Sequence, residues 1–114
     1  MATSGTPMTE LNADFLKEND DVAEVILSKT EMQKKQTLKG IKFSDYKESI
    51  EKIPLEGCLG IRITLKNELY GYDIPIPKGQ KIYPEKTEVE PEKDKLKVKI
   101  FKETKFNLKA GMFR

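Results

Sequence analysis

Apolar and polar residues alternate along three stretches in the second half of the chain. In an extended segment alternate side chains point to the same face, and isoleucine, valine and tyrosine suit the surface of a sheet. The apolar members of these stretches are Leu59, Ile61, Ile63 and Leu65, then Tyr70, Tyr72, Ile74 and Ile76, and finally Leu96, Val98 and Ile100. The pattern predicts three strands of an antiparallel sheet, at 59–65, 70–76 and 96–102, with one buried face.

Prolines and a short polar segment indicate how the first two strands connect and end. Lys66-Asn67-Glu68 has the length of a hairpin turn between them. Pro75 and Pro77 have no backbone N–H to donate to a neighbouring strand. The second strand is therefore predicted to lie at a sheet edge, or to leave the sheet by Ile76.

The rest of the second half fits the same fold class. Pro84 and Pro91 bracket a segment that is predicted to be an extended excursion to another sheet. Upstream, Leu38–Phe43 is predicted to be a short strand interrupted by Gly40. The residues expected to fold back onto the core at the end of the chain are Phe106, Leu108, Met112 and Phe113. The sequence predicts a mainly β, antiparallel sandwich-like single domain over 38–109, followed by a C-terminal tail at 110–114.

The first third of the chain has a different pattern. Residues 1–8 are small and polar and are expected to be disordered. In the acidic segment 9–37, Val22, Val25, Ile26 and Lys29 fit one face of a helix, and a helix-forming polar run follows them. The same residues also allow a strand over 22–27, because the run is short and rich in β-branched residues. We predict a short helical or mobile segment, with the strand as the alternative.

Composition limits the size and the location of the protein. The 114 residues suffice for one domain, and 37% are hydrophobic while 35% are charged. The net charge of +2 combines an acidic start with a basic end. The single cysteine excludes an internal disulfide, no apolar run is long enough for a membrane span, and no secretory signal is visible. We expect the cytoplasm or the nucleus and no membrane association.

Few residues have the chemistry of an active site. The chain has no histidine, no glycine-rich phosphate loop and no cysteine cluster. Cys58, which with Leu59 is flanked by Gly57 and Gly60, is interpreted as a small buried apolar residue. Glu68 and Asp73 are interpreted as surface charges rather than an acid–base pair. We therefore expect no enzymatic activity, no catalytic residue, no metal site and no cofactor.

A row of lysines is the strongest candidate for a binding surface. Lys95, Lys97 and Lys99 alternate with the apolar residues of the last strand, so they share its solvent side. Their expected neighbours are Arg62, Tyr70 and Tyr72. Three interpretations are open: a solvated face that keeps a sheet edge from pairing, a surface for an acidic protein partner, and a weak nucleic-acid surface. Aromatic residues are not interleaved with the lysines, which disfavours single-stranded nucleic acid.

The order of three segments in the second half is typical of a known family. The alternating strand that ends at Ile76 leads to Ile-Tyr-Pro-Glu-Lys-Thr at 82–87, and then to Lys-Leu-Lys-Val-Lys-Ile-Phe-Lys at 95–102. This order resembles the CS domain, the α-crystallin-like β-sandwich of co-chaperones of the large heat-shock ATPase chaperone and of related adaptors. The resemblance implies a non-enzymatic binding module that contacts a protein, such as a chaperone or a complex subunit, through an exposed sheet face. On this chain that face would hold Arg62, Lys97 and Lys99.

A second resemblance involves the middle of the same region. The positions that carry it are Leu69, Gly71, Ile74, Ile76, Pro77, Gly79 and Tyr83. Their spacing is similar to the signature of the small C subunit of eukaryotic heterotrimeric ribonuclease H. That resemblance implies a non-catalytic accessory subunit of a nuclease complex, interlaced with a partner subunit. It ranks behind the CS domain.

Overall fold

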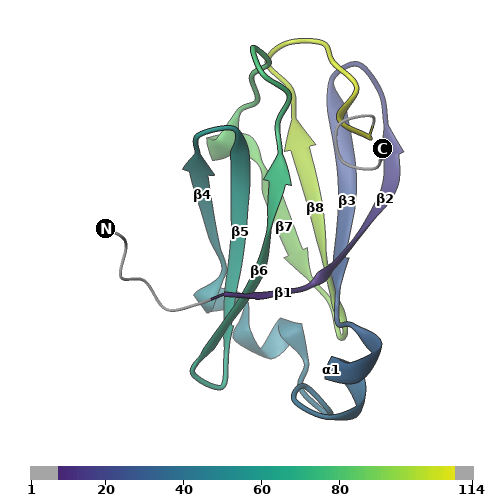
Figure 1. Ribbon diagram of the computed structural model, residues 1–114, viewed down its shortest axis with the longest axis vertical. Helices are drawn as coiled ribbons and strands as arrows, with labels where there is room; N and C mark the ends of the chain where they lie inside the picture. Colours follow the sequence, from purple (N-terminus) through teal and green to yellow (C-terminus); the bar gives the residue numbers. More distant parts are fainter. Residues whose placement is uncertain (1–7, 110–114) are drawn as a thin grey trace.

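The computed structural model describes residues 8–109, which form a β-sandwich of two four-stranded sheets (Figure 1). Sheet A has the order β1-β6-β5-β4 and sheet B the order β2-β3-β8-β7. The bounds in sheet A are β1 Thr9–Glu10, β6 Glu68–Pro75, β5 Cys58–Leu65 and β4 Glu51–Leu55. Those in sheet B are β2 Asn12–Glu18, β3 Val22–Ser28, β8 Lys95–Phe101 and β7 Glu88–Pro91. The mainly β prediction is confirmed.

The core lies between the inner faces of the two sheets, and alternation explains its membership. Leu59, Ile61 and Ile63 of β5 are fully buried, as are Val98 and Ile100 of β8. All three predicted strands exist, and β5 and β6 pair in antiparallel order. The third, β8, belongs to sheet B and not to the sheet of the other two. The strands have one buried face each, but those faces meet across the core rather than within one sheet.

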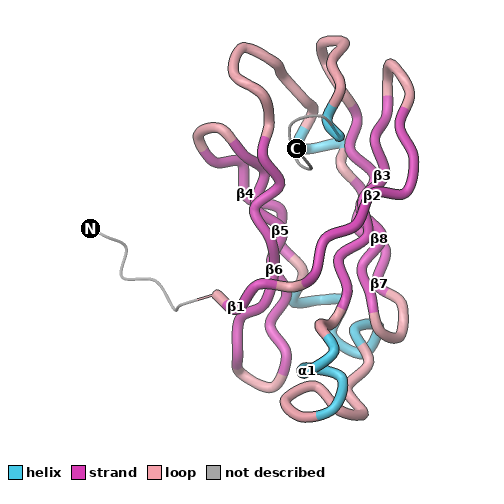
Figure 2. The backbone as a smooth tube through the Cα atoms, turned by 45° about the vertical axis from the view of Figure 1, so that its right-hand side comes forward, coloured by secondary structure: helices cyan, strands magenta, loops and turns pink. Residues whose placement is uncertain are grey.

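Within residues 8–109 the chain passes between the sheets three times, and the passage from β3 to β4 runs through two short helices, which are described below; the other two join strands more directly. At the first, β1 pairs in parallel with β6, and the chain then continues through the buried Leu11 into β2 of the opposite sheet (Figure 2). At the last, β6 ends at Pro75 and the chain crosses to β7, which pairs with β8. The short 3-10 helix η2, Pro84–Lys86, lies on this path. Both the exit by Ile76 and the excursion to another sheet are confirmed.

The helix expected in segment 9–37 is wrong for residues 22–28, where the alternative holds. The strand β3 lies between β2 and β8, with Ala23, Val25 and Leu27 fully buried on its inner side. Its outer side also carries apolar residues, so the alternation of a half-buried strand is blurred there. The helical signals belong to a five-residue helix, α1 (Glu31–Lys35), which Thr30 caps. Segment 9–37 thus supplies three strands of the sandwich.

The strand expected at Leu38–Phe43 is also wrong, because a buried lysine organises this segment instead. The Lys29 ammonium donates to the Leu38 carbonyl at 3.0 Å and to the Ile41 carbonyl at 2.5 Å. It also pairs with Asp94 Oδ1 at 2.9 Å. In an extended strand the carbonyls of residues three apart point to opposite sides, so two that converge on one ammonium indicate turns instead. The 3-10 helix η1, Phe43–Ser49, follows, with its Phe43 ring fully buried.

A second buried lysine fixes the end of the described chain. The Lys102 ammonium lies 2.6 Å from Glu18 Oε2 and donates to the carbonyls of Asn19 at 2.6 Å and Phe106 at 2.7 Å. The Glu18 carboxylate accepts in turn from the Leu108 N–H at 2.5 Å. Phe106 packs against the core and Leu108 is buried, so their predicted fold-back is confirmed. Met112 and Phe113, the tail 110–114 and residues 1–7 lie outside the described residues.

Candidate functional site

The outward side of sheet A forms a surface that we call the Arg62 face. The inward side chains of β5 alternate with outward ones, and the strand registers extend this assignment to β1, β4 and β6. The outward residues are Glu10, Glu51, Ile53, Leu55, Cys58, Gly60, Arg62, Thr64, Leu69, Gly71, Asp73 and Pro75. Apolar residues and glycines outnumber the charged ones on this face.

Arg62 lies flat on the sheet and not out in solvent. Its Nη1 is 2.8 Å from Asp73 Oδ1 on the neighbouring strand, and it donates to the Ile61 carbonyl at 3.3 Å. The guanidinium passes over Gly60, where a Cβ would stand 2.9 Å from Nη1. Only 14% of the Arg62 side chain is exposed. The absence of a side chain at Gly60 therefore lets the ion pair settle onto the sheet.

Apolar side chains that are exposed or half-buried share this face with the ion pair. Leu55 is 42% exposed, and it is one of three large apolar residues that the described part of the chain leaves exposed. Ile53 and Leu69 are half-buried, and neither belongs to the core cluster. Burial raises the pKa of the Cys58 thiol, and the Asp73 carboxylate raises it further against the effect of Arg62. The Cys58 thiol is therefore uncharged at neutral pH, and it is half-buried on the outer face rather than buried in the core as expected.

The outward side of sheet B, which we call the Lys97 face, is charged and balanced. One row across its four strands is Lys17, Glu24, Lys99 and Glu88, in which neighbours have opposite charges. The next row is Asp14, Ile26, Lys97 and Glu90. With Lys95, the described strands place four lysines and four carboxylates on this face, so its net charge is zero. A phosphate backbone requires an excess of cations, which these strands do not present.

The structure separates the predicted site residues. Arg62 lies on the outer face of sheet A, whereas Lys97 and Lys99 lie on the outer face of sheet B. Tyr70 is 2% exposed and belongs to the core, with its hydroxyl donating to Glu68 Oε1 at 2.9 Å. Burial raises the pKa of Tyr70, and the hydrogen bond to Glu68 raises it further. Tyr72 is half-buried against the core. A single face that holds all five residues does not exist.

Sequence reasoning missed the contribution of β4. This edge strand places Ile53 and Leu55 beside Gly60 and Cys58 of β5. The available signal was the alternation of Ile53 and Leu55 on either side of Pro54, since proline is tolerated in an edge strand. Pro75 of β6 extends the same apolar surface opposite Cys58.

Residues 8–109 contain no group of three or more cysteine or acidic side chains placed to hold a metal ion. Within that range no helix has the length and hydropathy of a membrane span. No family model, curated protein or solved structure matches the chain.

Proposed function

We propose that the protein is a non-enzymatic protein-binding module, a co-chaperone or adaptor of the kind that its sequence resembles, and that the Arg62 face is its contact surface. The observation that carries the proposal is the outward side of sheet A, where the exposed Leu55 and the half-buried Ile53 and Leu69 share a face with the fixed Arg62–Asp73 ion pair. Apolar residues grouped on the surface of a domain are typical of interaction sites. The CS-like order of residues makes the large heat-shock ATPase chaperone the first partner to test.

The geometry of Arg62 suits an interface. Arginine is enriched in protein interfaces, where its planar group contacts both apolar and acidic surface. Here the guanidinium is already held by Asp73 at 2.8 Å and rests on the sheet at Gly60. A partner that covers it orders little additional side chain, so binding loses less conformational entropy than it would over a mobile lysine.

The two alternatives have weaker support. The basic strand expected to attract nucleic acid lies on the charge-balanced Lys97 face, where Glu88 and Glu24 flank Lys99. An accessory subunit that is interlaced with a partner needs strands which the isolated chain leaves unpaired. Residues 8–109 instead close a sandwich whose core is built from both of its own sheets.

A matched pair of substitutions tests the proposed surface. Leu55 and Leu16 are 42% and 50% exposed, but Leu16 lies on β2 of the opposite sheet. We expect Leu55→Glu to lose the proteins that the wild-type chain retains from its native source, and Leu16→Glu to keep them. Calorimetry with the purified heat-shock ATPase chaperone then checks the named partner, with at least tenfold weaker binding expected for Leu55→Glu. Equal retention by the two variants would rule out the Arg62 face.

A further inference from the structure

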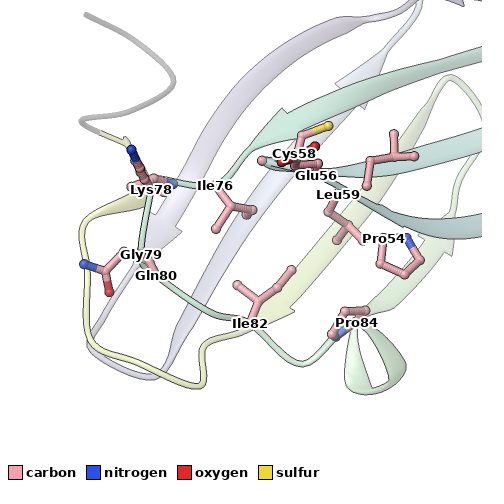
Figure 3. Close-up of a pocket in the computed structure, with 13 residues that line it drawn as sticks. Pro54, Glu56, Cys58, Leu59, Ile76, Lys78, Gly79, Gln80, Ile82 and Pro84 are labelled. Atoms are coloured by element: carbon pink, nitrogen blue, oxygen red, sulfur yellow. The ribbon is translucent and has the colours of Figure 1, made fainter.

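A preformed cavity of about 450 Å³ lies at the end of the sandwich, beside the Arg62 face (Figure 3). The turn between β4 and β5 forms one side, and the crossing segment 76–84 forms the other. Among the apolar residues that line it are Pro54, Leu55, Leu59, Ile76, Ile82 and Pro84. Leu59 is fully buried, so the cavity reaches down to the core. Its volume falls within the range of about 300–1,000 Å³ that is usual for ligand pockets.

Hydrogen bonds hold the cavity walls in place. The Ile76 N–H donates to the Gly57 carbonyl at 2.9 Å, which ties the crossing segment to the β4–β5 turn. The Gln80 side chain accepts from the Thr104 hydroxyl at 2.8 Å. The Tyr83 N–H donates to the Phe101 carbonyl at 2.8 Å. Prolines in the lining fix further backbone angles, so an occupant enters a site that already has its shape.

We propose that this cavity takes one bulky apolar side chain, aromatic or long aliphatic, from an extended segment of a protein partner that also lies on the Arg62 face. The inference deepens the proposed function and rests on it. Leu55 and Cys58 belong to both the face and the cavity lining, so a segment on the face reaches the cavity directly. A small polar ligand is a poorer occupant, because the charged lining residues Glu56 and Lys78 are exposed and of opposite sign.

Charge complementarity defines the rest of the partner segment. The acidic residues on the face and the cavity rim are Glu10, Glu51, Glu56 and Asp73, and the basic ones are Arg62 and Lys78. The excess of two negative charges favours a segment with basic residues next to its apolar anchor. The expected ligand is therefore a short extended peptide with one large apolar residue and flanking lysine or arginine.

Selection from a random peptide phage library tests the inference directly. We expect the selected peptides to share a bulky apolar residue with a basic neighbour. Ile82→Trp fills the cavity, and we expect it to weaken their binding at least tenfold in a fluorescence polarisation assay. Ile26→Trp makes the same change at a half-buried position of the Lys97 face and should alter binding less than twofold. Peptides without this pattern, or equal binding by the two variants, would overturn the inference.

Two further measurements separate the cavity from the face and protect the test against a folding defect. Ile53→Glu changes the face without touching the cavity lining. Loss of binding in Ile53→Glu but not in Ile82→Trp refutes the cavity alone, and the reverse result refutes the face alone. Titration of the wild-type protein with N-acetyl-tryptophan amide should shift the amide signals of Gly57, Ile76 and Ile82. Absent or scattered shifts would count against the cavity even if the tryptophan variant failed to fold.

Discussion

Replacement of Lys102 by methionine should destabilise the protein strongly, because this lysine joins three parts of the chain. Its side chain is 1% exposed, and its ammonium contacts the Glu18 carboxylate and two backbone carbonyls, from Asn19 and Phe106. Methionine keeps most of the length and the apolar stem, so the core loses little packing. The substitution therefore isolates the loss of the charge and its hydrogen bonds.

The expected cost can be assembled from the groups left behind. Removing one partner of a buried ion pair costs about 3–5 kcal/mol. The Glu18 carboxylate is 14% exposed and keeps the N–H groups of Leu108 and Lys109, which places its share at the lower end. The two carbonyls lose a donor each, at roughly 1 kcal/mol or more apiece. We expect a total loss of about 5 kcal/mol, a large part of the roughly 5–15 kcal/mol that is usual for a domain.

Urea denaturation followed by circular dichroism measures this loss. The slope of the free energy of unfolding against urea concentration should stay constant while the midpoint falls, because the surface exposed on unfolding does not change. Lys105→Met is the matched control: its side chain is 78% exposed, its partner Asp20 is 4.0 Å away, and its loss should cost under about 1 kcal/mol. Equal midpoints for the two variants would refute the role assigned to the buried lysine.

Three other predictions concern acid stability, a close strand contact and a turn. Burial raises the pKa of Glu18, but the bonds from Lys102 and two amides outweigh it, and the Lys29 bond lowers the pKa of Asp94. The pKa of each carboxyl group is thus below its ordinary value of 4.5 for Glu18 and 3.8 for Asp94, so both groups stabilise the fold at pH values above these. The free energy of unfolding should fall as the pH drops below them, and Glu18→Gln should weaken that dependence. Gly71→Ala places a Cβ 1.9 Å from the Ile61 carbonyl oxygen, so it should cost about 2 kcal/mol or more in urea denaturation. Gly60→Ala meets only the Arg62 guanidinium, which can shift where a backbone carbonyl cannot, and it should cost less. Lys66 and Asn67 have φ of 49° and 69°, so Lys66→Asn combined with Asn67→Gly should raise the melting temperature by the equivalent of about 0.5–1 kcal/mol; a lower value would contradict the turn type.

One-sided burial explains which strands the sequence predicts. In β5, β6 and β8 the inner residues are apolar while the outer ones are mostly polar or glycine, so period-two alternation is visible. In β3, Val22 and Ile26 add apolar residues to the outer side, so the pattern of residues 22–27 also fits a helix. The turns at 36–42 depend on the Lys29 ammonium, a tertiary contact that no local pattern encodes.

The candidate surface was harder to predict because it depends on strand pairing between distant segments. Alternation alone puts Arg62 and Lys97 on the solvent side of their strands, but it does not say that the strands belong to opposite sheets. Tyr70 lies four residues from the buried Ile74, so alternation along the strand puts both side chains on the inner face. The Arg62 ion pair needed the register of β5 with β6, which brings Asp73 opposite Gly60.

Hydroxyl-radical footprinting of the protein, alone and in complex with the partner recovered by affinity purification, tests the proposed contact surface most directly. The two exposed leucines serve as opposed reporters, since Leu55 lies on the Arg62 face and Leu16 on the other sheet. If the Arg62 face is the contact surface, the partner will protect Leu55 from oxidation and leave Leu16 unchanged. Protection of Leu16 with full reactivity at Leu55 would contradict it.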